Sequence, residues 1–328
     1  MPICTNCTHP TPYLYTVYNS RDNLRLEQCS ECGSFADPYV EHDALTLWID
    51  LILLKRDVFR HLLFNREAGA RRLTTDKSNQ ARENVPSLAS TEHHREKRRW
   101  FLIAQLGLGL IAIDAYPSAS FDQDSTYDEV ASWNQDALGG YFRILVGCLI
   151  ETLGFHIGVT FASFIVLHSL DRVRSFKRVQ IAPSGLRLQF RYSHIPLTIL
   201  YSSLNKFFLL FLLTIWRPKS DSIGGAPRLA PQHNASELFT HPLALRALTL
   251  LDDDTLDRAW IVRNVLGGMA TGFGLRVVLD CHPLLTTLVI LAGWAVKTAL
   301  AQLVSGWVGA GLGGVSVAEE MWLAYSIP

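Results

Sequence analysis

The sequence predicts a mainly α-helical polytopic membrane protein with a small N-terminal β-hairpin ribbon. Two observations carry this prediction. Four of the 6 cysteines form two Cys-x2-Cys pairs within the first 32 residues, and the apolar residues gather in long blocks. Hydrophobic residues make up 48% of the 328-residue chain and charged residues only 18%, below the roughly 25% usual for soluble domains. Basic and acidic residues balance at 30 each, so the net charge gives no reason to expect a nucleic acid partner.

Residues 1–44 form the predicted ribbon, a polar and turn-rich segment. Within it, "YLYTVY" and "LRLEQC" flank "NSRDN", which predicts two short strands around a turn. The paired cysteines are Cys4, Cys7, Cys29 and Cys32. A two-residue spacing lets two thiolates turn onto one metal, and two such pairs supply the four-sulfur tetrahedral shell that zinc prefers. A site of this kind has no open coordination position, so the zinc ribbon is expected to be structural and not catalytic.

Two other uses of these cysteines remain open, a pair of disulfides and a redox pair. A reducing cytosolic location disfavours both. The remaining cysteines, Cys148 and Cys281, fall in or beside apolar blocks and are expected to act as small hydrophobic residues.

The segment 45–65 is predicted to be one amphipathic helix. In its sequence from residue 48, "WIDLILLKRDVFRHLLFN", apolar residues fall on one broad side and charged residues lie opposite. Such a helix is too charged to cross a membrane and would lie in the interface between membrane and water. The residues that define it are Trp48, Asp50, Lys55, Phe59, Arg60 and His61. The alternative is a helix packed against the zinc ribbon inside a soluble core.

A basic polar segment and a long apolar region follow. Residues 66–99 lack apolar periodicity, which predicts a flexible linker. A span needs roughly 20 residues, and by this measure residues 100–304 predict a transmembrane domain with three to five spans. The apolar blocks lie at 100–116, 142–167, 195–216, 260–279 and 283–304. Residues 305–328 form a Gly-rich C-terminal tail.

The distribution of charge orients these spans. The 66–99 linker and the 170–194 loop are basic, whereas the 117–140 loop holds five acidic residues and no Lys or Arg. Because basic loops tend to stay on the cytosolic side, we expect the N-terminus, the linker and the 170–194 loop in the cytosol. The sequon at Asn234 would then face the lumen, where a glycan can be attached.

Ionisable residues within the apolar blocks are the next candidates for function. Such groups are costly at membrane depth and need a partner or a wet cavity. We expect Lys206 to be the counter-ion of Glu151, and a polar furrow between helices to hold a lipid headgroup whose phosphate meets basic side chains. The headgroup candidates are Glu151, His156, Lys206, Arg263 and Arg276. The alternative is that these groups pair only to fasten the helices together.

The remaining motifs add little chemistry. Gly268 and Gly272 have the spacing of a close helix-packing motif. The sequence contains no Gly-rich phosphate loop, nucleophile elbow or histidine-zinc motif, so we predict no catalytic residues. An enzyme hypothesis would rest on Glu151 and His156 alone.

The first 65 residues resemble the Arv family, eukaryotic endoplasmic-reticulum membrane proteins of lipid homeostasis. The resemblance rests on both cysteine pairs, on "LYTVYNSRDNLRLEQCSECGSFADPYVEHD" and on "IDLILLKRDVFRHLLFN". The "EHD" at 41–43 departs from the family pattern, which has a tyrosine in the middle. The resemblance implies zinc on the four N-terminal cysteines and residence in the endoplasmic reticulum membrane, extending to the Golgi. It carries over no catalytic residue.

The resemblance also implies a role in intracellular sterol distribution, with effects on sphingolipid metabolism and on early glycosylphosphatidylinositol intermediates. Our leading hypothesis is therefore a non-enzymatic protein that moves or presents these membrane lipids. A second hypothesis is a scaffold that recruits lipid-biosynthetic membrane enzymes through the zinc ribbon. A third is an intramembrane lipid-modifying enzyme built on Glu151 and His156.

Overall fold

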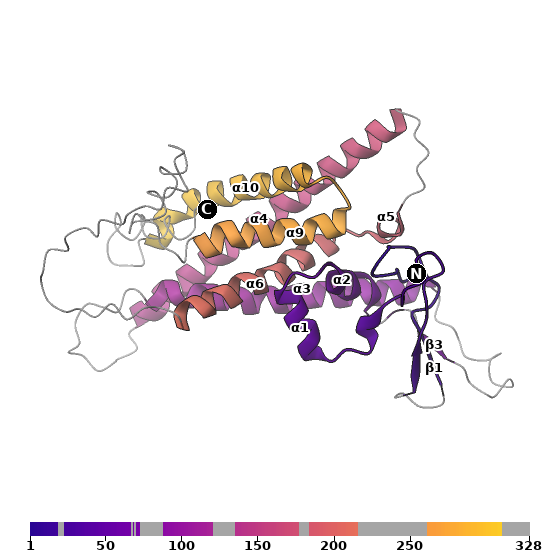
Figure 1. Cartoon of the computed structure of the whole chain (residues 1–328). Coiled ribbons are helices and arrows are strands. Elements are labelled where there is room, and N and C mark those ends of the chain that lie inside the picture. The colour runs from indigo at the N-terminus through magenta and orange to yellow at the C-terminus, as the bar shows by residue number, and fades with distance from the viewer. Residues whose placement is uncertain are drawn as a thin grey trace, which may run out of the picture.

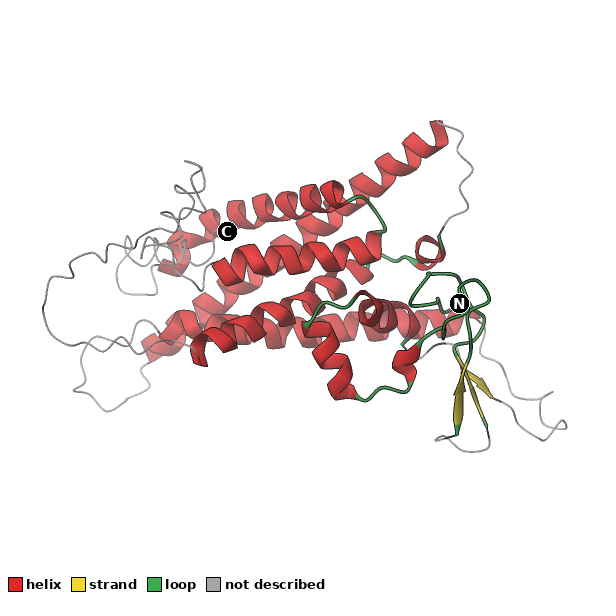
Figure 2. Cartoon of the chain, viewed as in Figure 1, coloured by secondary structure: helices red, strands yellow, loops and turns green. Residues whose placement is uncertain are grey.

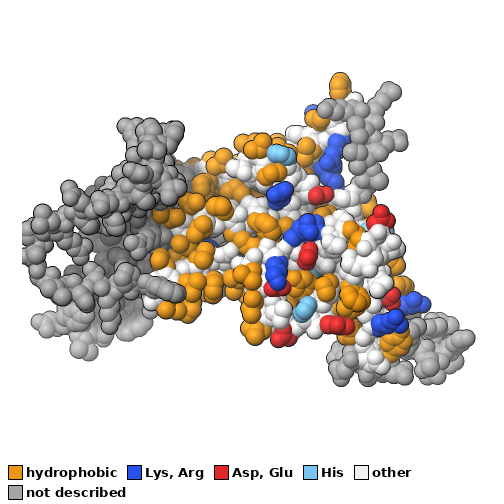
Figure 3. Space-filling view, viewed as in Figure 1, with side chains coloured by type: hydrophobic (Ala, Val, Ile, Leu, Met, Phe, Trp, Pro, Cys, Tyr) orange, Lys and Arg blue, Asp and Glu red, His pale blue; other side chains and the backbone are white. Residues whose placement is uncertain are grey.

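Long helices form most of the molecule, and a small module that contains the strands lies at one end of them (Figures 1 and 2). The computed structural model describes residues 1–18, 23–66, 68, 70–72, 88–120, 135–176, 184–215 and 261–309. On the face drawn in Figure 3, apolar side chains cover the described parts of the long helices, and most charged side chains lie toward the N-terminal module. The predicted fold class is confirmed, with mainly helical structure and short strands beside a cysteine cluster.

Within the described residues, each of the five apolar blocks is helical, and the fourth extends over η4 and α9. The long helices are α3 (Leu88–Ser120), α4 (Gln135–Phe176), α6 (His194–Ile215), α9 (Gly267–Leu279) and α10 (Pro283–Gly309). The shorter elements beside them are η1 (Pro38–Val40), α5 (Gly185–Gln189) and η4 (Val262–Leu266). The predictions for residues 121–134, for Asn234 and for the tail beyond Gly309 concern residues outside the described part of the chain.

Three of the helices could cross a membrane, judged by length and composition within the described residues. The qualifying segments are Phe142–Phe176, His194–Leu213 and Pro283–Val308. In contrast, α9, which is 13 residues long, and η4, which runs directly into it, are not among these segments. Three is the lower end of the predicted range of spans.

Glycines let α9 and α10 approach closely. A Cβ atom added to Gly268 would lie 3.0 Å from the Trp294 ring, and one added to Gly272 would lie 2.9 Å from the Ile290 side chain. Since larger side chains at these positions would collide with α10, the close packing predicted for the two glycines is confirmed.

The strands form a three-stranded sheet in the order β2-β1-β3. The predicted hairpin corresponds to β1 (Tyr15–Val17) and β2 (Leu24–Leu26), which pair antiparallel. The third strand, β3 (Ala70–Arg72), pairs parallel to β1 from far along the chain. It satisfies the backbone groups at an edge that would otherwise be open.

The structure differs from the predicted linker at 66–99. β3 lies in its first part, and α3 already begins at Leu88, whereas residues 73–87 lie outside the described part of the chain. The charged stretch that ends at Arg99 is rich in Glu, Lys and Arg, which are good helix formers. The helix therefore extends toward the N-terminus well beyond its apolar block.

The single helix predicted over 45–65 is broken in the structure. α1 (Ala44–Ile52) and α2 (Arg56–Arg60) are separate, and one π-helical turn, η2 (His61–Asn65), continues from α2. At the break, Leu54 has a φ of 55°, a left-handed conformation that ends an α-helix. The break was not predicted, because the apolar positions keep their helical spacing across the charged residues 55–57.

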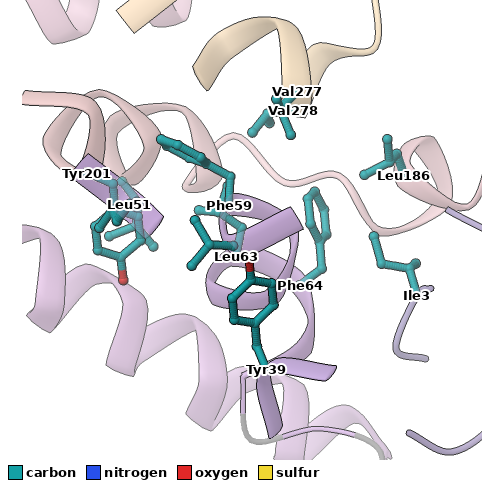
Figure 4. Close-up of a cluster of buried hydrophobic side chains, with 12 residues drawn as sticks. Ile3, Tyr39, Leu51, Phe59, Leu63, Phe64, Leu186, Tyr201, Val277 and Val278 are labelled. Atoms are coloured by element: carbon teal, nitrogen blue, oxygen red, sulfur yellow. The ribbon is translucent and has the colours of Figure 1, made fainter. Parts of the chain in front are cut away.

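The second half of this segment is anchored to the long helices. Phe59 and Leu63 are buried in one cluster with Tyr201 of α6 and with Val277 and Val278 of α9 (Figure 4). Burial of each large apolar side chain stabilises by about 1.5–3 kcal/mol. The N-terminal module is thus packed onto the helices and not merely tethered to them.

Candidate metal centre and polar site among the helices

The four predicted zinc ligands come together in the N-terminal module. Their Sγ atoms all lie within 4.8 Å of one another. The Sγ atoms of Cys4 and Cys32 are 3.7 Å apart, and those of Cys7 and Cys29 are 3.5 Å apart. Sulfur atoms at tetrahedral corners about 2.3 Å from one metal are about 3.8 Å apart, so the site fits a single ion. No two of these cysteines form a disulfide, since all four are free thiols.

Both cysteine pairs sit in the same kind of turn. The backbone N–H of Thr8 donates to the carbonyl of Cys4, and that of Gly33 donates to the carbonyl of Cys29, each at 2.9 Å. Thr8 and Gly33 have φ values of 67° and 71°. Glycine adopts this conformation freely, whereas a β-branched threonine does so at a cost. The repeated turn aims two sulfur atoms of each pair at a common point.

The thiols differ in how readily they ionise without a metal. The Ser34 hydroxyl, 2.9 Å from the Cys32 Sγ atom, lowers the pKa of the Cys32 thiol to about 6. Burial raises the pKa of Cys7 to about 12. A bound divalent cation deprotonates the thiols that coordinate it. Four sulfur donors at this spacing therefore suit a metal that accepts a full thiolate shell.

Asp37 connects the metal centre to η2. Its side chain is fully buried, and its Oδ2 accepts hydrogen bonds from His61 Nδ1 at 2.7 Å and from Asn65 Nδ2 at 2.8 Å. Asn65 also donates to the carbonyl of Ile3 and accepts from its N–H, at 2.8 and 2.9 Å. The polar side of the 45–65 segment thus holds the chain beside Cys4.

Arg60 makes a second connection. Its Nη1 donates to the carbonyl of Thr5 at 2.7 Å and to that of Asn6 at 2.8 Å. These are the two residues between Cys4 and Cys7. Burial lowers the pKa of Arg60, yet both bonds are charge-assisted and hence strong. Arg60 and His61 were expected on a free polar face. Instead, Arg60 holds the turn between Cys4 and Cys7 and His61 holds Asp37, as expected for a helix packed against the ribbon.

The first half of the segment presents an apolar face. Its exposed side chains are Leu45 at 66%, Trp48 at 50%, Ile49 at 48% and Leu53 at 64%. The charged residue of this half, Asp50, does not lie on this face.

Asp50 is buried. It accepts a hydrogen bond from the Tyr39 hydroxyl at 2.9 Å and pairs with Lys55 at 2.7 Å. Burial, together with this contact to Asp50, raises the pKa of Tyr39. Of the predicted interfacial residues, Trp48 is exposed on the apolar face and Phe59 is fully buried.

A polar site lies among the long helices. Lys206 Nζ is 3.1 Å from Asp114 Oδ2, and Arg263 Nη1 is 3.9 Å from Asp114 Oδ1. These groups line a cavity of about 130 Å³ together with His156 and Lys297. The structure therefore gathers three of the five predicted headgroup candidates around one cavity.

The other two candidates lie elsewhere. Arg276 is exposed in the last turn of α9, away from the cavity lining. Glu151 is buried at 5% exposure and interacts electrostatically with Lys297, but it does not line the cavity that contains His156. The predicted pairing of Lys206 with Glu151 is replaced by the ion pair with Asp114.

Two important residues escaped the sequence reasoning. Asp114 ends the first apolar block, and an acidic residue at that depth was a signal that it needs a partner. Asp37 carried no such signal, because it lies in a polar segment where a carboxylate is usually exposed.

Comparison with known proteins gives the family. The model of the Arv1-like family matches residues 3–225, well beyond the N-terminal resemblance. Protein ARV1 of Saccharomyces cerevisiae is 49% identical over 63 residues, 19% of each chain. Protein ARV 2 of Arabidopsis thaliana is 29% identical over 213 residues, 65% of this chain and 72% of that protein. Protein ARV1 of Homo sapiens is 36% identical over 62 residues, 19% of this chain and 22% of that one.

The similarity is uneven along the chain. The match spans only 19% and 24% of the lengths of the two yeast proteins from Saccharomyces cerevisiae and Schizosaccharomyces pombe. No solved structure matches the chain. The family model covers about two thirds of the sequence, including the metal centre, α3, α4 and α6. The chain therefore belongs to the Arv1-like family.

Proposed function

We propose that the protein mediates the trafficking and homeostasis of sterols and other lipids at the endoplasmic reticulum membrane, and extends to the Golgi. In this role it affects sphingolipid metabolism and the handling of glycosylphosphatidylinositol precursors, and it catalyses no reaction. Membership of a lipid-homeostasis family supports the proposal. The names of its relatives carry no enzyme designation, which agrees with a non-enzymatic role.

The metal in this proposal is a structural Zn²⁺ on the cytosolic side. A shell of four thiolates at tetrahedral spacing is the donor set that structural zinc prefers. Cys4, Cys7, Cys29 and Cys32 would hold it. Bound zinc would fix the two cysteine turns, and the first of these turns accepts the hydrogen bonds of Arg60.

The exposed apolar face of α1 is the observation that carries the mechanism. The exposed side chains of this face are those of Leu45, Trp48, Ile49 and Leu53. They belong to the N-terminal module that contains the metal centre, hereafter the metal module, whereas α2 is fixed to the long helices. A short apolar face at this place is suited to enter the headgroup region of a membrane. There it would disturb or sense the packing of lipids in the cytosolic leaflet.

Removal of two metal ligands tests the proposal. The double variant Cys29→Ser and Cys32→Ser should contain no zinc by metal analysis, because two of the four ligands are lost. Delivery of newly made sterol from the endoplasmic reticulum to the plasma membrane should then fall severalfold, since the fixed position of α1 depends on the metal module.

The double variant Cys148→Ser and Cys281→Ser is the matched control. Both cysteines lie outside the cluster, so zinc content and sterol delivery should be unchanged. Normal delivery in the Cys29/Cys32 variant, with zinc shown to be absent, would rule out a role of the metal module in transport.

A scaffold is the second candidate function. The same exposed face of α1 would contact a helix of a lipid-biosynthetic membrane enzyme. Purified protein in liposomes separates the two functions, because a carrier should transfer labelled sterol unaided and a scaffold should not.

A further inference from the structure

An apolar groove runs between α3, α4 and α6. Its volume is about 770 Å³, within the roughly 300–1,000 Å³ of typical ligand sites. Leu108, Ile157 and Phe161 are among the residues that line it, and each is more than 60% exposed. The groove is thus open along the side of the helices, where an apolar chain can enter from a surrounding membrane.

The groove adjoins the polar cavity described above. Gly107, Ile111, Thr152, His156 and Leu200 line both spaces. Together they form one amphipathic site, with an open apolar limb and a polar limb of about 130 Å³. A ligand that fills both limbs must combine a hydrocarbon part with a small polar part.

The charges around the polar limb favour an anion. Lys206, Arg263 and Lys297 line it, and Asp114 is the carboxylate in its lining. Glu151, which interacts with Lys297, is a second carboxylate nearby. Among the described residues of this site, three cations therefore meet two anions. A buried charge excess is costly, and one negative charge on a ligand would balance it.

His156 adds an independent observation. Its Nδ1 donates to the carbonyl of Thr152 at 2.7 Å, so the lone pair of a neutral ring lies on Nε2. The Nε2 atom has less than 1 Å² of exposed area and no hydrogen-bond partner. A buried polar atom without a partner is costly. Since His156 lines both limbs, a hydroxyl group at their junction would satisfy it.

We propose that this cavity binds one molecule of a singly charged phosphodiester lipid whose headgroup carries a hydroxyl. Its acyl chains occupy the groove, its phosphate meets Lys206, Arg263 and Lys297, and a headgroup hydroxyl donates to His156 Nε2. The inference rests on the proposed lipid-handling function and names the class of lipid bound at this site. The polar limb lies near Lys206, in the middle of α6, so the headgroup would be held away from both ends of the helices.

The test uses purified full-length protein and native mass spectrometry with four lipids. Phosphatidylglycerol has the expected charge and hydroxyl, phosphatidylmethanol has the charge alone, cholesterol has the hydroxyl alone, and phosphatidylcholine is zwitterionic without one. Phosphatidylglycerol should bind at least about fivefold more tightly than the other three. Equal binding of phosphatidylcholine or cholesterol would overturn the proposal.

Two single-charge variants sharpen the test. Lys297→Gln removes the positive excess and should weaken phosphatidylglycerol binding about tenfold, whereas Asp114→Asn increases the excess and should preserve or strengthen it. Damage to the fold would weaken binding in both variants. The proposal is overturned if both variants lose binding, or if neither changes it, in protein that still unfolds cooperatively.

Two further variants address the other contacts. His156→Leu should lower binding of phosphatidylglycerol to the level of phosphatidylmethanol, because only the hydroxyl contact is lost. Leu153→Trp should fill the groove and block both lipids, whereas Leu188→Trp on α5, outside the groove, should block neither. These tests measure lipid binding and not sterol delivery. A negative result here would therefore not contradict the proposed role of the metal centre in transport, and normal sterol delivery without zinc would not contradict lipid binding in the groove.

Discussion

At the scale of single residues, Asp37 is the clearest example of a side chain whose loss should be costly. It is fully buried and accepts hydrogen bonds from His61, Asn65 and the Tyr39 backbone. Asp37→Ala leaves these donors without an acceptor, so the free energy of unfolding should fall by about 3 kcal/mol or more. Thermal unfolding in detergent measures the change.

The control for this variant is Asp43→Asn at the start of α1. Asp43 is an exposed N-cap that accepts from the Thr46 N–H at 3.1 Å, and asparagine caps helices equally well. Its unfolding temperature should stay within experimental error of the original protein. If Asp37→Ala behaves like this control, Asp37 does not fix η2 to the metal module.

The predictability of single residues depended on how local their signal was. The four cysteines could be predicted because the two-residue spacing alone defines a metal turn. The partners of Asp37, Arg60 and Lys206 could not, because they lie 24 or more residues away in the sequence. The cost of burying a charge shows that such a residue needs a partner, but it does not show which one.

At the scale of elements, glycines set the contact between α4 and α10. A Cβ atom added to Gly158 would lie 3.1 Å from Val296 Cβ and 3.2 Å from the Gly293 backbone, whereas one added to Gly306 meets nothing within 4 Å. Gly158→Leu should therefore lower the free energy of unfolding by about 2 kcal/mol or more through overpacking. Gly306→Leu should not destabilise. Equal unfolding temperatures for the two variants would contradict this picture of the interface.

The exposed face of α1 makes a second prediction at this scale. A nitroxide at Leu45→Cys, in protein reconstituted in nanodiscs without Cys148 and Cys281, should be more accessible to oxygen dissolved in lipid than to a water-soluble nickel complex. A label at His42→Cys, an exposed polar position just before the helix, should show the opposite preference. A preference for the nickel complex at both positions would place α1 in water.

The apolar blocks were predictable because a helix that crosses a membrane needs a long run of apolar residues. The break between α1 and α2 was not, because apolar residues recur at helical spacing before and after the charged residues 55–57, and nothing local signals the positive φ of Leu54. β3 was missed for a related reason. A three-residue strand has almost no periodicity of its own, and its partner β1 is more than 50 residues away.

At the scale of the whole molecule, the charge pattern and the packing agree. Charge predicted the N-terminus and the 170–194 loop on one side of the membrane. In the structure, Ile3 and Leu186 of α5 belong to one buried cluster (Figure 4). These two parts of the chain must therefore share a side, whichever side that is.

Labelling in sealed microsomes tests which side it is. Leu188 is 66% exposed. In a protein without Cys148 and Cys281, the variant Leu188→Cys should react with a membrane-impermeant maleimide while the vesicles are intact. Asn234 should carry a glycan, as expected for a lumenal loop. Labelling of Leu188→Cys only after permeabilisation would reverse the predicted orientation.

The parallel pairing of β3 with β1 has a practical consequence. It joins the beginning of the module to a strand that lies beyond residue 65, where the resemblance of the N-terminal segment ends. A fragment that ends at residue 65 would lose that strand. One edge of β1 would then have unpaired backbone groups, which can pair with strands of neighbouring molecules and cause aggregation. A fragment intended to stay soluble on its own should keep the chain through Arg72.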